Sequence, residues 1–178
     1  MTTANYTRTA VALHWLVALL IIGGFAVGVT MVDLPLSPTK ARVFAYHKWA
    51  GLTVLGLAAV RLAWRLTHPA PPDLPMPLWQ ARVARATHVL LYVLMFAVPV
   101  LGWLYTSAAG FPVVYFKLIQ IPDLVAKDKE LAELLKPVHG ALAWSLAVLV
   151  ALHVAAALKH HFLERDATLR RMLSWRRS

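Results

Sequence analysis

The chain has 178 residues, of which 60% are hydrophobic, and its mean hydropathy is +0.62. Soluble domains are about half apolar, and the excess here lies in long uncharged runs, which indicates a membrane protein. The formal net charge is +10, but Lys and Arg mostly flank the apolar runs, which favours membrane contact over a nucleic-acid partner. Because the chain has no cysteine, disulfides, iron–sulfur clusters and covalently attached c-type haem are excluded.

Four apolar stretches, each long enough to cross about 30 Å of hydrocarbon, predict four transmembrane helices. Their predicted ranges are about 9–32, 43–66, 86–106 and 137–159. The first stretch is too long for the core of a signal peptide and lacks a convincing cleavage site, so we predict a retained helix. Pro137 is predicted to open the fourth helix, and no internal repeat is evident. The predicted fold is a single all-α domain over residues 1–178, a four-helix transmembrane bundle.

Lys and Arg are distributed unequally between the two sides of this bundle. The side with the N-terminus, the second loop and the C-terminal tail has eleven, and the other side has seven. Four of the eleven are in the tail: Arg170, Arg171, Arg176 and Arg177. The positive-inside rule therefore predicts that both termini are cytoplasmic.

Several histidines lie inside the predicted spans, where polar side chains are costly and usually functional. At about 1.5 Å per residue, His47 and His139 are predicted near the outer face, and His14 lies near the cytoplasmic face. His153 lies deeper toward the inside, fourteen residues or about 21 Å from His139 on roughly the same helix face. His88 is predicted to open the third helix at the inner edge, so either His14 or His88 matches His153 in depth.

Facing imidazoles at one depth are the ligands of a b-type haem, and two such levels predict two haem b groups. Zinc is a weaker alternative, because structural zinc usually takes four ligands at one place. A single histidine near a helix end is more often interfacial or hydrogen-bonded, and we expect this of His68 and His161. Gly51 and Gly140 would let a macrocycle approach the neighbouring histidines, although ordinary helix packing explains such small residues equally well.

Basic residues near the helix ends are candidates for anion contacts. Arg61, Arg65, Arg82 and Arg85 are candidates for pairing with haem propionates, with anionic lipid as the stronger alternative for most of them. A basic outer surface would also concentrate an anionic substrate. The outer candidates for this steering are Lys48, Lys127, Lys129 and Lys136. Interfacial lysines with acidic neighbours in the same loop are the simpler explanation.

Motifs occur in all four spans and in the tail. They are His14-Trp15, His47 with Arg61-Leu62, His88 with Leu91-Tyr92, Pro99 and Gly102, His139, Leu152–His161, and Asp166–Met172. Together they resemble the bacterial di-haem cytochrome b561 family over nearly the whole chain. The resemblance implies a multi-pass protein of the bacterial inner membrane.

The resemblance also implies roles for six histidines. It implies that His14 and His153 bind the inner haem, His47 and His139 bind the outer haem, and His88 and His160 bind a quinone. Because the match is closest to the superoxide oxidase branch, superoxide at the periplasmic face is the expected electron donor and ubiquinone the acceptor.

Two other functions stay open at this point. One is a haem b subunit that passes electrons between a separate dehydrogenase and quinone, and the other is a non-redox transporter that depends on histidine. The expected partners are membrane lipid, quinone and superoxide, with no nucleic acid and no obligate protein partner.

Overall fold

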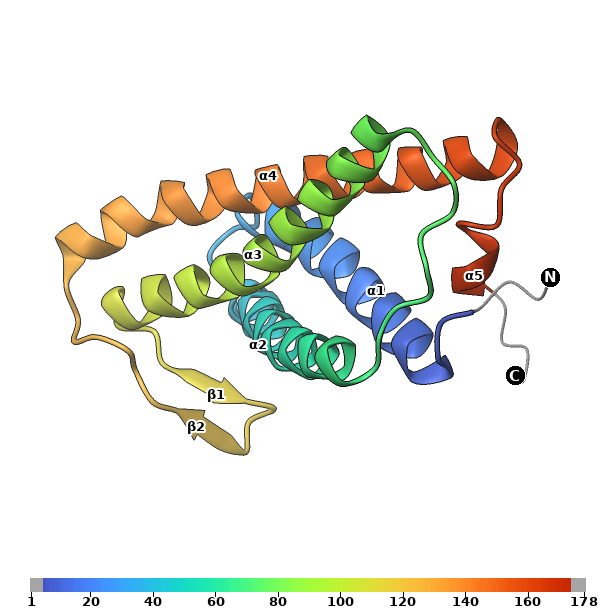
Figure 1. Cartoon of the computed structure of the whole chain (residues 1–178). Helices are drawn as coiled ribbons and strands as arrows, with labels where there is room; N and C mark the ends of the chain where they lie inside the picture. Colours follow the sequence, from blue (N-terminus) through green and yellow to red (C-terminus); the bar gives the residue numbers. More distant parts are fainter. Residues whose placement is uncertain (1–4, 174–178) are drawn as a thin grey trace.

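A computed structural model describes residues 5–173, which form a bundle of long helices (Figure 1). The helices are α1 (Arg8–Met31), α2 (Pro38–Thr67), α3 (Leu78–Ala108) and α4 (Lys129–Phe162). Within the described range, these four are long and apolar enough to cross a membrane. The predicted all-α, four-helix transmembrane bundle is therefore confirmed. Arg176 and Arg177 of the predicted basic tail lie outside the described residues.

The helices α2 and α3 begin earlier than their apolar stretches do. α2 begins at Pro38 instead of residue 43, because the Ser37 hydroxyl accepts the Lys40 N–H at 3.2 Å and proline suits the first turn. α3 begins at Leu78 instead of residue 86, directly after the proline-rich loop, and ends at Ala108. An apolar run marks only the part of a helix that crosses hydrocarbon, whereas caps and prolines determine where the helix ends.

The helix α4 also begins before its predicted start. It starts at Lys129, where the Asp128 carboxylate accepts the Leu131 N–H at 3.1 Å and Glu130 adds negative charge to the first turn. The prediction that Pro137 opens this helix is therefore wrong. Pro137 lies inside α4, where it removes one backbone hydrogen bond without ending the helix.

A short β-hairpin connects α3 to α4 and was not predicted. Its strands are β1 (Val113–Tyr115) and β2 (Ile119–Ile121), paired antiparallel. Phe116 and Lys117 at the tip have φ of 48° and 63°. Tight hairpin turns of this kind usually carry glycine, asparagine or aspartate, so this turn has no recognisable signal in the sequence.

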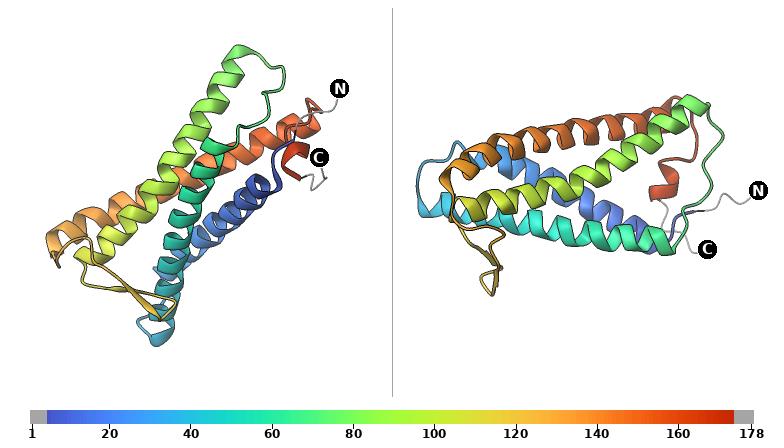
Figure 2. Two further views of the ribbon diagram at one scale, coloured as in Figure 1. Left: turned by 60° about the horizontal axis from the view of Figure 1, so that its bottom comes forward. Right: turned by 60° about the vertical axis from the view of Figure 1, so that its left-hand side comes forward.

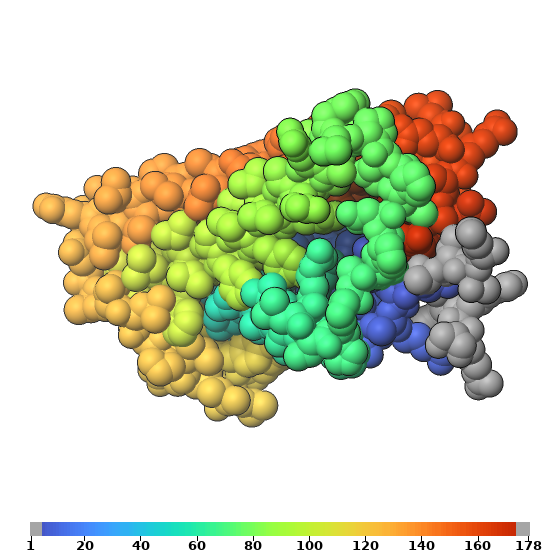
Figure 3. Space-filling view, viewed as in Figure 1, coloured from blue at the N-terminus to red at the C-terminus, as the bar shows by residue number. Residues whose placement is uncertain are grey.

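One end of the bundle brings together the start of α1, the end of α2, the start of α3 and the end of α4 (Figure 2). We call this the inner end, after its predicted cytoplasmic side, and the opposite end, which carries the hairpin, the outer end. The short helix α5 (Arg170–Leu173) folds back onto the inner end. The Trp15 indole N–H donates to the Met172 carbonyl at 2.8 Å, and Arg171 donates to the Pro72 carbonyl at 2.8 Å. The proline-rich loop and the C-terminal segment thus lie together across the inner end (Figure 3).

The core of the bundle has two apolar clusters, a thin layer between the two ends and a cluster of Ala108, Ala132 and Leu135 at the outer end. Val17 of α1, Ala58 of α2 and Met95 of α3 are at most 3% exposed and pack together. Large apolar side chains such as Leu19 and Leu152 are at least 60% exposed, which is the pattern expected of a surface that faces lipid. The buried layer lies between the outer and inner levels of histidine.

Candidate functional site

The outer level brings together His47 of α2 and His139 of α4, whose ring centres are 6.3 Å apart. An imidazole nitrogen binds a metal ion at about 2 Å and lies about 1 Å from its ring centre, so two imidazoles on opposite sides of one ion have ring centres about 6 Å apart. The two rings are nearly perpendicular, with an interplanar angle of 87°. This spacing would allow the two imidazoles to hold one metal ion between them.

Hydrogen bonds determine which nitrogen of each outer histidine is free. His47 Nδ1 lies 2.9 Å from the Gly24 carbonyl oxygen, and His139 Nδ1 lies 3.1 Å from the Val98 carbonyl oxygen. Because a carbonyl oxygen only accepts, each Nδ1 carries the hydrogen. Each Nε2 therefore keeps a lone pair, and this tautomer is the one that metal-binding histidines commonly adopt.

Two glycines allow these imidazoles their positions. A Cβ atom on Gly28 would lie 2.8 Å from His47 Cε1, and one on Gly102 would lie 2.9 Å from His139 Cε1. Both distances are shorter than carbon atoms tolerate, so only glycine fits at these places. A Cβ atom on Gly140, which follows His139 directly, would meet nothing within 4 Å. The close approach of the two rings to neighbouring helices thus depends on glycines of α1 and α3.

An apolar hollow, open on one side, lies between His47 and His139. Small residues account for much of its wall: Gly24, Ala50, Gly51, Ala143 and Ala147. Among the described residues, no third histidine or carboxylate joins this pair, so the site does not fit four-coordinate structural zinc. A larger apolar groove on the outward side of α3 and α4 contains no histidine and faces the lipid region.

The inner level contains three histidines, His14 of α1, His88 of α3 and His153 of α4. The His14 and His153 ring centres are 6.2 Å apart, and those of His88 and His153 are 5.4 Å apart. The prediction that His88 opens α3 is wrong, because α3 starts ten residues earlier and places His88 about 15 Å along the helix. Of the three, His88 is the exposed one, whereas His14 and His153 are half-buried.

Arg61 and Tyr92 add polar groups to the inner level. Arg61 Nη2 donates to His14 Nδ1 at 3.0 Å, and its guanidinium lies 5.5 Å from the centre of the Tyr92 ring. The buried Tyr92 hydroxyl has no hydrogen-bond partner in the described part of the chain. A buried hydroxyl without a partner is costly, so this corner suits a ligand that supplies an acceptor.

Equal spacings in the four helices reveal an internal repeat that the sequence analysis missed. Fourteen residues separate each of four pairs: His14 and Gly28, His47 and Arg61, His88 and Gly102, and His139 and His153. The unit α1–α2 packs His47 against Gly28, and the unit α3–α4 packs His139 against Gly102 in the same way. His47 of the first unit and His139 of the second unit therefore occupy equivalent positions. At the inner level the equivalent positions differ, because the first unit has Arg61 where the second unit has His153.

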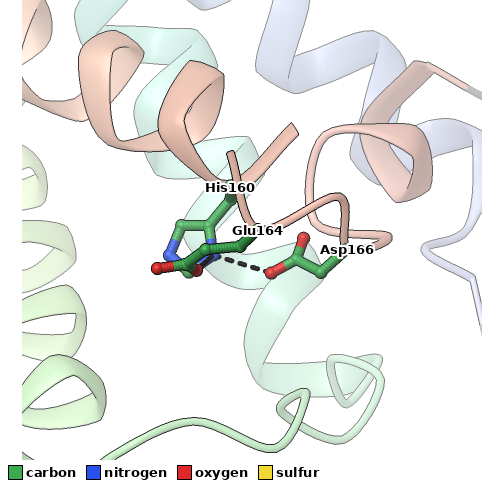
Figure 4. A group of neighbouring side chains, drawn as sticks. All are labelled: His160, Glu164 and Asp166. Atoms are coloured by element: carbon green, nitrogen blue, oxygen red, sulfur yellow. Dashed lines mark hydrogen bonds and ion pairs between the residues drawn. The ribbon is translucent and has the colours of Figure 1, made fainter. Parts of the chain in front are cut away.

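At the inner end, His160 Nδ1 lies 2.6 Å from a Glu164 oxygen and 2.7 Å from an Asp166 oxygen (Figure 4). His160 is seven residues beyond His153, or about 10 Å along α4, so it lies nearer the inner end than His88 does. The structure does not bring His88 and His160 into direct contact. A ligand that reaches both histidines has to extend along the inner third of the bundle.

The two histidines expected to be interfacial differ in their surroundings. The exposed His68 ring stacks on Trp64 with ring centres 3.8 Å apart, and its Nδ1 shares a hydrogen bond with Thr67 at 2.9 Å. This arrangement fits the expectation. His161 Nδ1, by contrast, is buried without a hydrogen-bond partner among the described residues.

The four outer lysines are in different environments. Lys48 Nζ lies 3.1 Å from the Pro112 carbonyl oxygen, and Lys129 Nζ lies 3.8 Å from a Glu133 carboxylate oxygen. Lys127 and Lys136 are exposed. Half of the predicted steering set is therefore engaged in contacts within the protein.

The family model for prokaryotic cytochrome b561 matches residues 5–175. The chain belongs to this family. It is 36% identical to Cytochrome b561 homolog 2 of Escherichia coli (strain K12), an alignment that covers 97% of this chain and 93% of the relative. It is 31% identical to Probable superoxide oxidase CybB of Yersinia pestis, with 97% and 98% covered. This cytochrome b561 is thus a haem-binding membrane protein of electron transfer, which contradicts the non-redox transporter alternative.

Proposed function

We propose that this cytochrome b561 holds two b haems and carries electrons from superoxide at its outer end to ubiquinone at its inner end. The observation that carries the proposal is the pair of imidazole–imidazole distances, 6.3 Å at the outer level and 6.2 Å at the inner level. Haem b, when bound, supplies the one-electron redox chemistry. The protein's own residues orient the ligands, exclude water and bind the substrates. The proposed location is the bacterial inner membrane, with both termini in the cytoplasm.

The outer haem is assigned to His47 and His139. The carbonyl groups of Gly24 and Val98 fix both rings in the tautomer that presents Nε2. Gly28 and Gly102 leave room for the rings beside α1 and α3. The hollow between the two histidines is lined by small apolar side chains, which suits a flat macrocycle.

The inner haem is assigned to His14 and His153. Their 6.2 Å separation would suit a haem iron held between two imidazoles better than the 5.4 Å between His88 and His153. If His14 binds iron through Nε2, its ring hydrogen has to be on Nδ1. The hydrogen bond from Arg61 to Nδ1 then has to break, because a protonated Nδ1 cannot accept it. A haem propionate is the acceptor that fits, because it would bind the freed guanidinium and also satisfy the Tyr92 hydroxyl.

Superoxide as the donor is supported by the Yersinia pestis relative and by the exposed outer lysines. The alternative, a donor protein such as a dehydrogenase, is favoured by one observation: the hairpin tip exposes Phe116 at 55% and Leu118 at 85%. Such apolar side chains suit a protein contact as well as a lipid contact.

A pulse of superoxide applied to the purified protein, with no partner present, separates these two donors. We expect the haem absorption to change to the reduced form, and superoxide dismutase added beforehand should abolish the change. A protein that dithionite reduces fully but superoxide does not would support a separate dehydrogenase as donor.

The quinone is assigned to the inner end, near His88 and His160. Imidazole N–H groups hydrogen-bond the two carbonyl oxygens of a quinone head group. His88 is exposed on the bundle surface and level with the inner histidine pair, so a quinone from the lipid phase can reach it.

Replacing His88 or His160 with leucine should leave the haem spectrum intact and slow quinone reduction by about tenfold or more, because each variant removes a hydrogen-bond donor. The measurement is the rate at which added ubiquinone reoxidises the reduced protein. His68→Leu is the matched control, because His68 is exposed and stacks on Trp64 away from the inner pair. Unchanged rates in both test variants would move the quinone site elsewhere.

A further inference from the structure

The cluster of His160, Glu164 and Asp166 lies between the end of α4 and the C-terminal segment (Figure 4). Two carboxylate oxygens contact the same imidazole nitrogen: Glu164 Oε2 lies 2.6 Å and Asp166 Oδ2 lies 2.7 Å from His160 Nδ1. The exposed fraction of the side chain is 17% in His160, 34% in Glu164 and 25% in Asp166. The cluster is therefore in reach of water at the inner end, while its histidine is largely enclosed.

Asp166 is ionised at neutral pH. Its partial burial acts to raise the pKa, but hydrogen bonds from the Thr168 backbone N–H at 2.7 Å, from the Thr168 side chain and from His160 lower the pKa below its ordinary value of 3.8. An ionised carboxylate only accepts, so His160 Nδ1 carries a hydrogen. A neutral ring in this tautomer has no hydrogen on Nε2. Only the doubly protonated imidazolium can donate from that nitrogen.

Contacts on several sides hold the carboxylates in place. The Asp166 N–H donates to the His160 carbonyl at 3.1 Å, and Lys159 Nζ lies 2.7 Å from the second Glu164 oxygen. Arg170 donates to the Asp166 carbonyl at 3.4 Å, and further along the segment the Met172 carbonyl is bound by Trp15 of α1. Within residues 5–173, the charged side chains that contact these three residues are Lys159, at the Glu164 carboxylate, and Arg170, at the Asp166 backbone. The fold, and not the histidine alone, therefore positions the carboxylates.

We propose that Asp166 and Glu164 are positioning residues that hold the Nδ1–H of His160, so that His160 takes up a proton from water at Nε2 and donates it to the reduced quinone. This rests on the proposed function, which supplies the quinone and the two electrons from the haems. In each donation the Nε2–H bond breaks and an O–H bond of the quinol forms. Water at the inner end then returns one proton to the cluster, so two donations complete one quinol. The two carboxylates held against Nδ1 keep a hydrogen on that nitrogen, so Nε2 is the nitrogen that takes up and releases the proton.

The same three side chains are also a candidate set of ligands for a divalent cation. The observed distances favour the proton-donating role. Ligand atoms around tetrahedral zinc, at about 2.0–2.1 Å from the ion, are about 3.3 Å apart, whereas Nδ1 here lies at hydrogen-bond distance from both oxygens. Lys159 further offsets the negative charge that would attract a cation.

The test uses the haem-loaded protein with Asp166→Asn, Glu164→Gln and the double variant. Glu133→Gln is the matched control, because Glu133 is an exposed carboxylate on the same helix, paired only with Lys129 at 3.8 Å. Haem content and quinone affinity should stay unchanged in all four. In the double variant we expect quinol formation to slow by about 10- to 100-fold, within the range for lost general acid catalysis. Asp166→Glu, which keeps a carboxylate at this position, should restore part of the rate.

Several outcomes would overturn the proposal. A double variant with the rate of the wild type would refute the role of the carboxylates, while a slow His160→Leu variant would still support the quinone site. If His160→Leu is also unaffected, the quinone assignment itself fails. Loss of quinone binding in the double variant would show a structural role only. Binding of one Zn²⁺ per chain, measured by calorimetry and abolished in the double variant, would assign the cluster to a metal ion instead.

Discussion

Replacing His139 with alanine should lower the haem content from two per chain to one. The variant removes one of the two imidazoles proposed for the outer haem, which are 6.3 Å apart, and leaves the inner pair untouched. His139 and His153 are about 21 Å apart on α4. The apolar layer of Val17, Ala58 and Met95 separates their levels, so each level should lose or keep its haem independently.

The measurement is a pyridine-haemochrome assay on purified protein, with the reduced absorption spectrum recorded beside it. His153→Ala should show the complementary loss, and His68→Ala should keep both haems. If His139→Ala loses both haems while circular dichroism shows an intact helix content, the picture of independent levels is wrong. Two haems in His139→Ala would show that His139 does not hold the outer haem.

Adding a single methyl group at Gly102 should also cost the outer haem. In Gly102→Ala the new Cβ would lie 2.9 Å from His139 Cε1, so the imidazole has to move away from its position between α3 and α4. Glycine to alanine in a helix favours the helix by about 1 kcal/mol, so a general loss of helix stability does not account for the effect. By the internal repeat, Gly28→Ala should act in the same way on His47.

The control is Gly140→Ala, because its added Cβ meets nothing within 4 Å although the residue adjoins His139. Haem content and the reduced spectrum are measured in all three variants. We expect Gly140→Ala to match the wild type, and Gly102→Ala and Gly28→Ala to lose most of the outer haem. Full occupancy with an unchanged spectrum in both latter variants would mean that the close approach has no role in haem binding.

The sequence alone was sufficient for the four helices and for the two levels of histidine. A helix that crosses the hydrocarbon core needs a long uncharged run of residues, so the number of such runs predicts the number of transmembrane helices. The constant rise of a helix then predicted that His47 faces His139 and that His14 or His88 faces His153. The structure brings these side chains together, because antiparallel helices across one membrane convert position in the chain into depth.

The ends of the helices and the depth of His88 were decided by features outside the apolar runs. Ser37 and Asp128 start α2 and α4 through hydrogen bonds to backbone N–H groups, and hydropathy does not register such caps. The error for His88 followed from the early start of α3 at Leu78. The repeated fourteen-residue spacing was present in the sequence, but it gained meaning only when Gly28 was seen against His47.

Other features depend on contacts between residues that are far apart in the chain, and only the tertiary structure decided them. The carbonyl of Val98 fixes the tautomer of His139, and Arg61 reaches His14 from another helix. Such contacts depend on how helices tilt and turn against each other, and that is set by the packing of all their side chains together. The composition of the chain determined that it lies in a membrane, whereas the packing of four helices determined which nitrogen of each histidine is free to bind.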